Sequence, residues 1–148
     1  EKQLGVETII IGDGPEIPNM REFIEIQKLQ NVHLLGNVKP ESVLELLKHC
    51  AIFVHPSIAD RWPQVFNEAS LLGIPILISS RSGVSNEYTE RFNENVLFDP
   101  FNPVELARKV ESLLKDEKLR SELGSYAKEI ANSRDGNSVV QDFTDLLK

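Results

Sequence analysis

Two carboxylates and a proline follow one another in the segment SIADRWPQVFNEASLLG, and their spacing suits the binding of a phosphorylated ligand. Asp60 ends a loop, Pro63 is predicted to open a helix, and Glu68 follows about a turn and a half later. The backbone N–H groups of Gln64 and Val65 fall in the first turn, where they have no helical partner and the helix dipole favours an anion. Glu68 would then accept hydrogen bonds from a vicinal diol such as a ribose. A glutamate that is merely solvated on the helix explains the same spacing, so both interpretations stay open.

The run TIIIGDGP is typical of the strand and glycine turn that begin a dinucleotide-binding domain. Its apolar part ends at Gly12 and Gly14, where backbone N–H groups can face a pyrophosphate. The third glycine of that fingerprint is replaced by Ile17, and the next predicted strand, NVHLLGN, contains no acid that could hold a ribose. NAD binding is therefore disfavoured, and Gly12 and Gly14 become candidates for contact with another nucleotide.

Composition and charge disfavour several classes of protein. The chain has 148 residues, 41% of them hydrophobic and 26% charged, which is typical of one soluble globular domain. The net charge of −7 disfavours nucleic acid as a partner, and no basic run offsets it. The longest apolar stretch, LLGIPILI, is too short to span a bilayer and is interrupted by Gly73 and Pro75.

The cysteine and histidine content predicts neither a disulfide nor a metal site. Cys50 is the single cysteine, which excludes an internal disulfide; with no recognisable signal peptide, we expect a cytoplasmic protein. His33, His49 and His55 are not spaced as metal ligands and no Asp-x-Asp occurs, so we expect no metal. We interpret His55, at a strand end, as a packing or loop residue rather than a catalytic base.

Strand-like runs alternate with helical patterns, which predicts an α/β fold with a parallel sheet and helices on both of its faces. We expect one domain over residues 1–131 and a C-terminal helical appendage over residues 132–148. The predicted strands are Thr8–Ile11, Val32–Leu35, Ile52–His55, Ile76–Ser79 and Val96–Phe98.

Prolines, glycine and asparagine mark the predicted helix ends. Pro18, Pro40 and Pro63 each suit a first helical turn, the first of these helices carrying apolar residues as far as Leu29 and the second as far as Cys50. Gly73 is a predicted C-terminal stop. Asn102 and Glu105 form a capping-box pattern before an amphipathic run, and from Glu117 the pattern indicates a surface helix as far as a break at 132–137.

The loops that follow the predicted strands are rich in glycine, serine, asparagine and proline. They read GDGP, GNV, HPS and SSRSGVSNE. Because parallel strands end on one edge of a sheet and ligands bind in the crevice there, these loops form one candidate binding region. Each loop taken alone is also what any α/β turn requires.

Taken together, these segments carry a resemblance to a known family. GDGP, VHLLGNV, AIFVHPSIADRWPQVFNEASLLGIPIL, SGVSNE and NENVLFDP follow the order and spacing found in the C-terminal, donor-binding half of the retaining family 4 glycosyltransferases of GT-B fold (glycosyl transferases group 1). The similarity runs from about Thr8 to Glu122. It implies a Rossmann-like domain that binds a nucleotide-diphosphate sugar for retaining transfer to an acceptor such as a glycan or lipid, as in polysaccharide biosynthesis.

The resemblance also implies roles for particular residues. The family's pair of glutamates falls on Asp60, as the catalytic acid that contacts the donor sugar hydroxyls, and on Glu68, as the ribose ligand. Asp60 is one methylene shorter than the family's glutamate. The implied base pocket is backbone at Gly36, Asn37 and Val38, and the implied sugar and phosphate contacts come from Arg61, Trp62, Gln64 and Val65. The donor would be a UDP-, GDP- or ADP-sugar, with no cofactor and no metal.

Several family elements have no counterpart in this sequence. They are a first strand, an Arg and a Lys that grip the donor diphosphate, and an N-terminal domain that binds the acceptor. We therefore expect this chain to be a fragment that is inactive alone. The full-length protein would act on its glycan or lipid acceptor through the N-terminal domain, which leaves room for peripheral membrane association.

Two alternatives belong to other classes of protein. The first is a Rossmann-like regulatory or assembly domain that has lost donor binding, which Asp60 and the replacement of family glycines by Val84 and Val96 would explain. The second is a sugar-nucleotide epimerase of similar two-domain architecture. Binding of a nucleotide sugar by the full-length protein separates the first alternative from a transferase, and inversion at the sugar C2 identifies the second.

Overall fold

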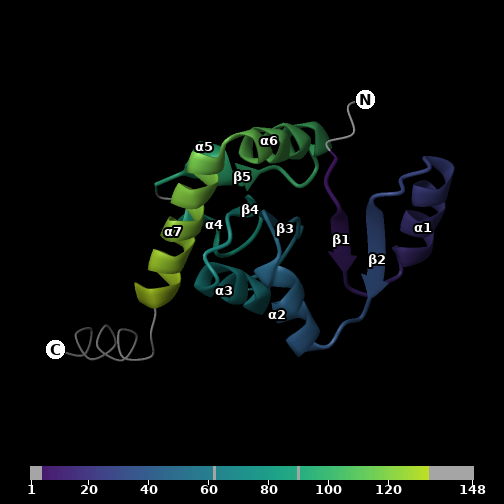
Figure 1. Cartoon of the computed structure of the whole chain (residues 1–148), viewed down its shortest axis with the longest axis horizontal. Coiled ribbons are helices and arrows are strands. Elements are labelled where there is room, and N and C mark those ends of the chain that lie inside the picture. Colours follow the sequence, from purple (N-terminus) through teal and green to yellow (C-terminus); the bar gives the residue numbers. More distant parts are fainter. Residues whose placement is uncertain (1–4, 62, 90, 134–148) are drawn as a thin grey trace. The chain divides into compact units, whose positions relative to one another are not determined.

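The computed structural model describes residues 5–61, 63–89 and 91–133 (Figure 1). The chain divides into two compact units, residues 1–45 and 46–148. The helix α2 (Pro40–Lys48) begins in the first unit and ends in the second. The fold class is the expected one, because parallel strands alternate with helices in both units.

In the first unit, β1 (Thr8–Ile11) and β2 (Val32–Gly36) form a parallel pair, with α1 (Ile17–Ile26) packed against β2. Thr8 pairs with Val32, and the register shifts by one residue between Ile10 and Ile11. The strand predicted at Thr8–Ile11 is confirmed in full, and the second extends one residue beyond its predicted end.

The end of α1 differs from the prediction, which extended the helical pattern to Leu29. The helix ends at Ile26, and Lys28 adopts a left-handed conformation with φ 52°. The N–H of Leu29 donates to Ile24 O at 3.0 Å, and that of Lys28 donates to Glu25 O at 3.1 Å. This pair of bonds is a Schellman motif, which glycine usually forms, so a lysine gave no sequence signal for the helix end.

The second unit contains a three-stranded parallel sheet in the order β3–β4–β5. These strands are β3 (Phe53–His55), β4 (Ile76–Ser79) and β5 (Leu97–Phe98), and all four residues of the central β4 are buried. A strand that is covered on both faces reads as a continuous apolar run, which is why Ile76–Ser79 was predictable from the sequence.

The helices of the second unit begin with α3 (Gln64–Leu71), which Gly73 follows at φ 70° as the predicted stop. Two short helices were not predicted, α4 (Ser85–Tyr88) and α5 (Asn93–Val96). In α6 (Pro103–Lys115), the Glu105 N–H donates to Asn102 Oδ1 at 3.1 Å, which confirms the predicted cap. The Glu105 carboxylate accepts from the Asp99 N–H.

The last described helix, α7 (Glu117–Ser133), is a core element, and the expectation of a surface helix was wrong. Leu123, Tyr126 and Ala127 are buried, and α7 packs against both α3 and β4. The many charged residues of this helix hid a narrow apolar stripe in the sequence. The predicted appendage over 132–148 lies, beyond Ser133, outside the described residues, and the single domain over 1–131 stays a prediction.

Two glycines let α7 approach α3 closely. A Cβ added at Gly124 would lie 2.1 Å from Gly73 O, far inside the contact distance. Beside this contact, the Tyr126 ring stacks on Tyr88 at 5.9 Å between ring centroids, and Tyr88 meets Phe66 of α3 edge to face at 5.3 Å. The Tyr88 hydroxyl in turn accepts from the Ile76 N–H at the start of β4.

We expect Gly124→Ala to destabilise the protein. Glycine to alanine within a helix normally stabilises, but here the methyl group meets a carbonyl oxygen and must displace α7 or α3, at a cost of about 1–3 kcal/mol. The free energy of unfolding in urea measures this. Ser125→Ala, at an exposed position of the same helix, is the control and should leave stability nearly unchanged. A Gly124→Ala variant as stable as the wild type would contradict the close contact.

Candidate functional site

No capping hydrogen bond from a described side chain occupies the amino-terminal end of α3. Pro63 is buried and precedes the helix as its N-cap, with an extended ψ of 125°. The prediction that Pro63 is the first helical residue was therefore off by one position. The Phe66 N–H donates to Pro63 O at 3.0 Å, which starts the helical hydrogen bonds. The N–H groups of Gln64 and Val65 lie before that bond in the first turn, as the sequence indicated.

Glu68 lies in the middle of α3 and is half-buried, while Gln64 is exposed and Val65 half-buried. On the helix, Gln64 and Glu68 are four residues apart and therefore share a face. Trp62 lies outside the described residues.

Asp60 and Arg61 are tied to the loop that follows β4. Asp60 and Ser82 form an isolated parallel bridge, and the Gly83 N–H donates to Asp60 O at 2.7 Å. A Cβ added at Gly83 would lie 2.1 Å from Arg61 O, so only glycine allows this approach. The loops after β3 and β4 are thus joined main chain to main chain beside the start of α3, which places Asp60 by backbone contacts.

His55, the last residue of β3, stands beside Asp60. Its Nε2 lies 3.5 Å from Asp60 Oδ2, and the two side chains are 14% and 33% exposed. Burial lowers the pKa of the His55 imidazole, and the charge and contact of the Asp60 carboxylate only partly oppose this. The His55 ring is therefore neutral at neutral pH, and its ring also stacks near Phe53.

The candidate residues of the first unit are brought together at the ends of its two strands. The Gly12 N–H donates to Gly36 O at 2.9 Å, directly after β1 and β2. A Cβ at Gly12, Gly14 or Gly36 would meet nothing within 4 Å, so all three glycines border open space. Val38 is half-buried and Asn37 exposed. The predicted site residues thus fall into two groups, one in each unit, and each group is compact.

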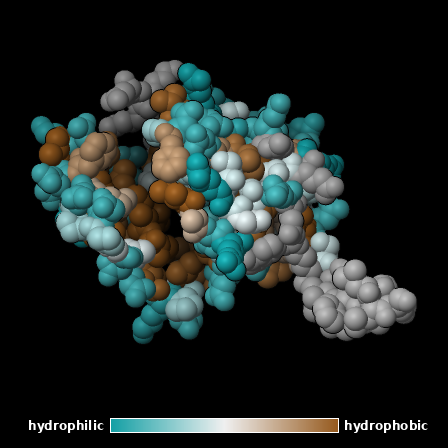
Figure 2. Space-filling view, turned by 180° about the vertical axis from the view of Figure 1, so that it is seen from behind, coloured by the Kyte–Doolittle hydropathy of each residue, from teal (hydrophilic) through white to brown (hydrophobic). Residues whose placement is uncertain are grey.

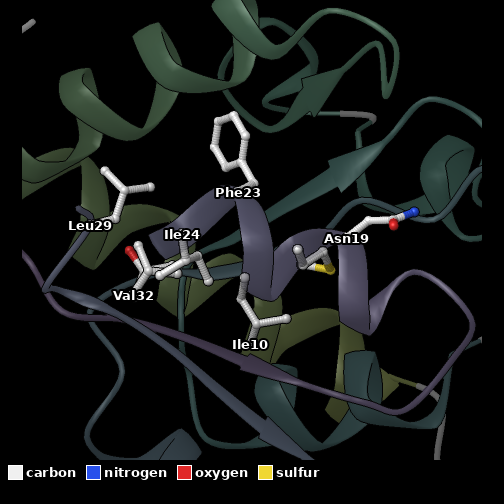
Figure 3. Close-up of a pocket in the computed structure, with 8 residues that line it drawn as sticks. Ile10, Asn19, Phe23, Ile24, Leu29 and Val32 are labelled. Atoms are coloured by element: carbon white, nitrogen blue, oxygen red, sulfur yellow. The ribbon is translucent and has the colours of Figure 1, made fainter. Parts of the chain in front are cut away.

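A cavity in the first unit is separate from these strand ends. It measures about 460 Å³ and is lined mainly by apolar side chains of β1, α1 and β2, including Ile10, Phe23, Ile24 and Val32 (Figure 3). Figure 2 shows hydrophobic residues at the surface of the molecule. Ile9 of β1 is one of the large apolar side chains that are exposed. An apolar lining does not suit a diphosphate, so we do not assign the nucleotide site to this cavity.

The described residues form neither a metal-binding cluster nor a membrane-spanning helix. Within the described residues, the acidic, histidine and cysteine side chains form no group of three that could hold a metal ion. The absence of a metal requirement stays a prediction. None of the described helices is both long and apolar enough to cross a membrane.

Comparison with known proteins decides the family. Residues 1–130, spanning both units, match the family described as glycosyl transferases group 1. This chain belongs to that family. The GT-B glycosyltransferase resemblance of the sequence is thereby confirmed.

Relatives and solved structures agree with this membership. An N-acetylgalactosaminyltransferase of Campylobacter jejuni, acting on N,N'-diacetylbacillosaminyl-diphospho-undecaprenol, is 31% identical over 93% of this chain and 36% of its own length. An uncharacterized glycosyltransferase of Methanocaldococcus jannaschii is 26% identical over 82% of this chain and 34% of its own. The chain thus spans about a third of these relatives.

Among solved structures, Anabaena HepE in complex with UDP superposes with a TM-score of 0.81 at 25% identity, over 98% of this chain and 41% of HepE. HepE has also been solved with UDP-glucose. The catalytic domain of the Helicobacter pylori cholesterol α-glucosyltransferase superposes with a TM-score of 0.69 at 23% identity, over 84% of this chain and 78% of that domain, which shows the shared fold.

Sequence reasoning missed the partners of Asp60. Ser82 and Gly83 hold its main chain and His55 faces its side chain, although His55 was interpreted only as a packing or loop residue. Gly83 was the available signal, since a glycine after a buried strand often permits a close backbone approach. Nothing in the sequence said which backbone would approach it.

We expect Gly83→Ala to loosen the loop that carries Asp60 and Arg61. The new methyl group would collide with Arg61 O. Either the bridge between Asp60 and Ser82 opens, or overpacking lowers the free energy of unfolding by roughly 1–3 kcal/mol. Lower protection of the amide at position 83, which donates to Asp60 O in the wild type, measures the opening relative to the rate of an unbonded amide of the same residue type, alongside unfolding in urea. Gly14→Ala, which introduces a methyl group into open space, is the control. Identical exchange and stability in both variants would contradict the described approach.

Lowering the pH is expected to cost stability through His55. Because the pKa of His55 in the folded protein lies below its ordinary value of 6.5, the unfolded chain binds this proton more tightly. The contribution is present above pH 6.5 and is lost as pH falls through the folded-state pKa. Urea unfolding at neutral and mildly acidic pH should show a larger loss for the wild type than for His55→Gln. An equal loss in both proteins would contradict the lowered pKa.

Proposed function

We propose that this chain is the donor-binding half of a glycosyltransferase, which holds a nucleotide-diphosphate sugar for retaining transfer of the sugar to a glycan or lipid acceptor. The observation that carries the proposal is the uncapped start of α3, with an acid in the preceding loop and another within the helix. In a member of this family, this arrangement would supply an anion site and two carboxylates for hydroxyl groups within one short segment.

The proposed transfer reaction mainly requires stabilisation of the negative charge on the leaving diphosphate. As the bond between the sugar and the diphosphate breaks, charge accumulates on the leaving diphosphate, and preorganised N–H donors stabilise it. The N–H groups of Gln64 and Val65, supported by the helix dipole, would supply part of this stabilisation. Arg61 and Trp62 belong to the same loop and would border the sugar and phosphates. The diphosphate-binding Arg and Lys of the family have no counterpart here, so we expect this chain alone not to turn over substrate.

The two carboxylates would divide the hydroxyl contacts between them. Glu68, half-buried in α3, is suited to accept hydrogen bonds from the ribose diol. Asp60, whose main chain is fixed by Gly83, would accept from a donor sugar hydroxyl. Backbone at Gly36, Asn37 and Val38 would border the base, together with Gly12, whose N–H donates to Gly36 O, and Gly14.

The uridine nucleotides are the first donors to test. HepE, 25% identical to this chain, was solved with UDP and with UDP-glucose. The Campylobacter jejuni relative, 31% identical, acts on an undecaprenol-linked substrate, which supports a lipid-linked acceptor for this protein too. Both relatives extend well beyond the region shared with this chain, so donor and acceptor are part of the proposal.

Calorimetric titration of the full-length protein and of this chain with UDP, GDP, ADP and their glucose and N-acetylglucosamine derivatives tests the function. We expect saturable binding by the full-length protein. Glu68→Ala should weaken it by about 1.5–3 kcal/mol, or roughly 10- to 150-fold, because a hydrogen bond to a charged group is lost.

Glu129→Ala, at an exposed position of α7, removes the same group elsewhere and should leave the affinity unchanged. A full-length protein that binds none of these nucleotides would overturn the proposal. It would favour the alternative, a regulatory or assembly domain that has kept the fold and lost the donor site.

A further inference from the structure

The Nε2 atom of His55 is a buried polar atom without a hydrogen-bond partner among the described residues. Buried side-chain nitrogens are nearly always hydrogen-bonded in proteins, because an unsatisfied one loses its hydration without compensation. Two contacts restrain His55. Its backbone pairs with Ile78 of β4, and its ring stacks on Phe53 with an angle of 28° between the two planes. An imidazole held in this way, with an unsatisfied nitrogen, calls for an acceptor that completes its bonding.

The Asp60 carboxylate stands where such an acceptor is needed. Its Oδ2 lies 3.5 Å from His55 Nε2, slightly longer than the 2.7–3.2 Å of a good N–H to oxygen bond. The Gly83 N–H donates to Asp60 O, which holds the main chain of Asp60 and keeps its carboxylate beside the ring. The Asp60 side chain is 33% exposed, so part of it faces solvent.

We propose that His55 is a positioning residue for the donor sugar: its Nε2–H holds one oxygen of the Asp60 carboxylate and leaves the other directed at a sugar hydroxyl. This rests on the proposed function, in which Asp60 accepts from the donor sugar. Because the imidazole is neutral, it orients the carboxylate without cancelling the negative charge that attracts the hydroxyl proton.

In this arrangement, different parts of the fold place the backbone of Asp60 and orient its carboxylate. The backbone of Asp60 is placed by the loop after β4, and the orientation of its carboxylate is placed by β3 through His55. His55 acts through Asp60 and would not contact the donor itself. Its loss should therefore affect the sugar and spare the nucleotide.

The experiment compares affinities for UDP and for UDP-glucose and UDP-N-acetylglucosamine in the full-length protein, by calorimetry. We expect His55→Leu to leave the Kd for UDP within about twofold and to raise the Kd for the preferred UDP-sugar about tenfold, the usual scale for a charge-assisted hydrogen bond. His55→Gln, whose amide can donate from nearly the same place, should recover most of the affinity. His49→Leu, the same change at an exposed histidine, should change neither Kd.

A double-variant cycle tests whether His55 acts through Asp60. The His55→Leu/Asp60→Ala variant should bind the UDP-sugar no more weakly than Asp60→Ala alone, because alanine has no oxygen for His55 to hold. Additive losses would overturn the positioning role while leaving the proposed function in place. A wild type that binds none of the UDP, GDP and ADP nucleotides would instead remove the proposed function, and this role with it.

Nitrogen NMR of the histidine side chains in the full-length protein gives a readout that needs no nucleotide. We expect His55 to be the Nε2–H tautomer at neutral pH and its Nε2 shift to move in Asp60→Asn, while the signals of His33 and His49 stay in place. A His55 protonated on Nδ1 instead, or one indifferent to Asp60→Asn, would overturn the proposal.

Discussion

The contact between the backbones of α3 and α7 is the constraint on which the second unit depends. Gly124 rests against the carbonyl of Gly73, so the two helices meet more closely than any side chain would allow. That closeness brings Tyr126 onto Tyr88, and Tyr88 onto Phe66 and the first N–H of β4. The helix whose N-terminus forms the candidate anion site is therefore anchored at its other end, away from the ligand.

The candidate site, too, is held together by contacts between main-chain atoms. The loops after β3 and β4 are joined by the bridge from Asp60 to Ser82 and by the hydrogen bond from Gly83. None of these links requires a particular side chain at position 60. Chemistry is added by His55, whose burial keeps it neutral beside a carboxylate. Position and chemistry thus come from different parts of the fold.

The sequence predicted those features that local chemistry dictates. The strand at Ile76–Ser79 is covered on both faces, and Asn102 caps α6 through its own side chain, so each left a signal within a few residues. Other features depend on contacts between segments far apart in the sequence or on backbone conformations that the residue type does not favour. They are the left-handed Lys28, the buried stripe of α7 and the approach of Gly83 to Arg61. For the site, the order of motifs indicated the loop and the acids, but His55 and Asp60 are five residues apart and only the strand end brings them face to face.

The main-chain bridge and hydrogen bond at position 60 do not depend on which side chain stands there. A lineage, or a laboratory library, can therefore vary the length and polarity of that side chain, together with its neighbour at position 55, while the scaffold stays intact. Under the proposed function, these two positions would set sugar selectivity while the main-chain contacts stay the same. Selection for a new donor would then begin with paired substitutions at these two sites rather than with redesign of the loop.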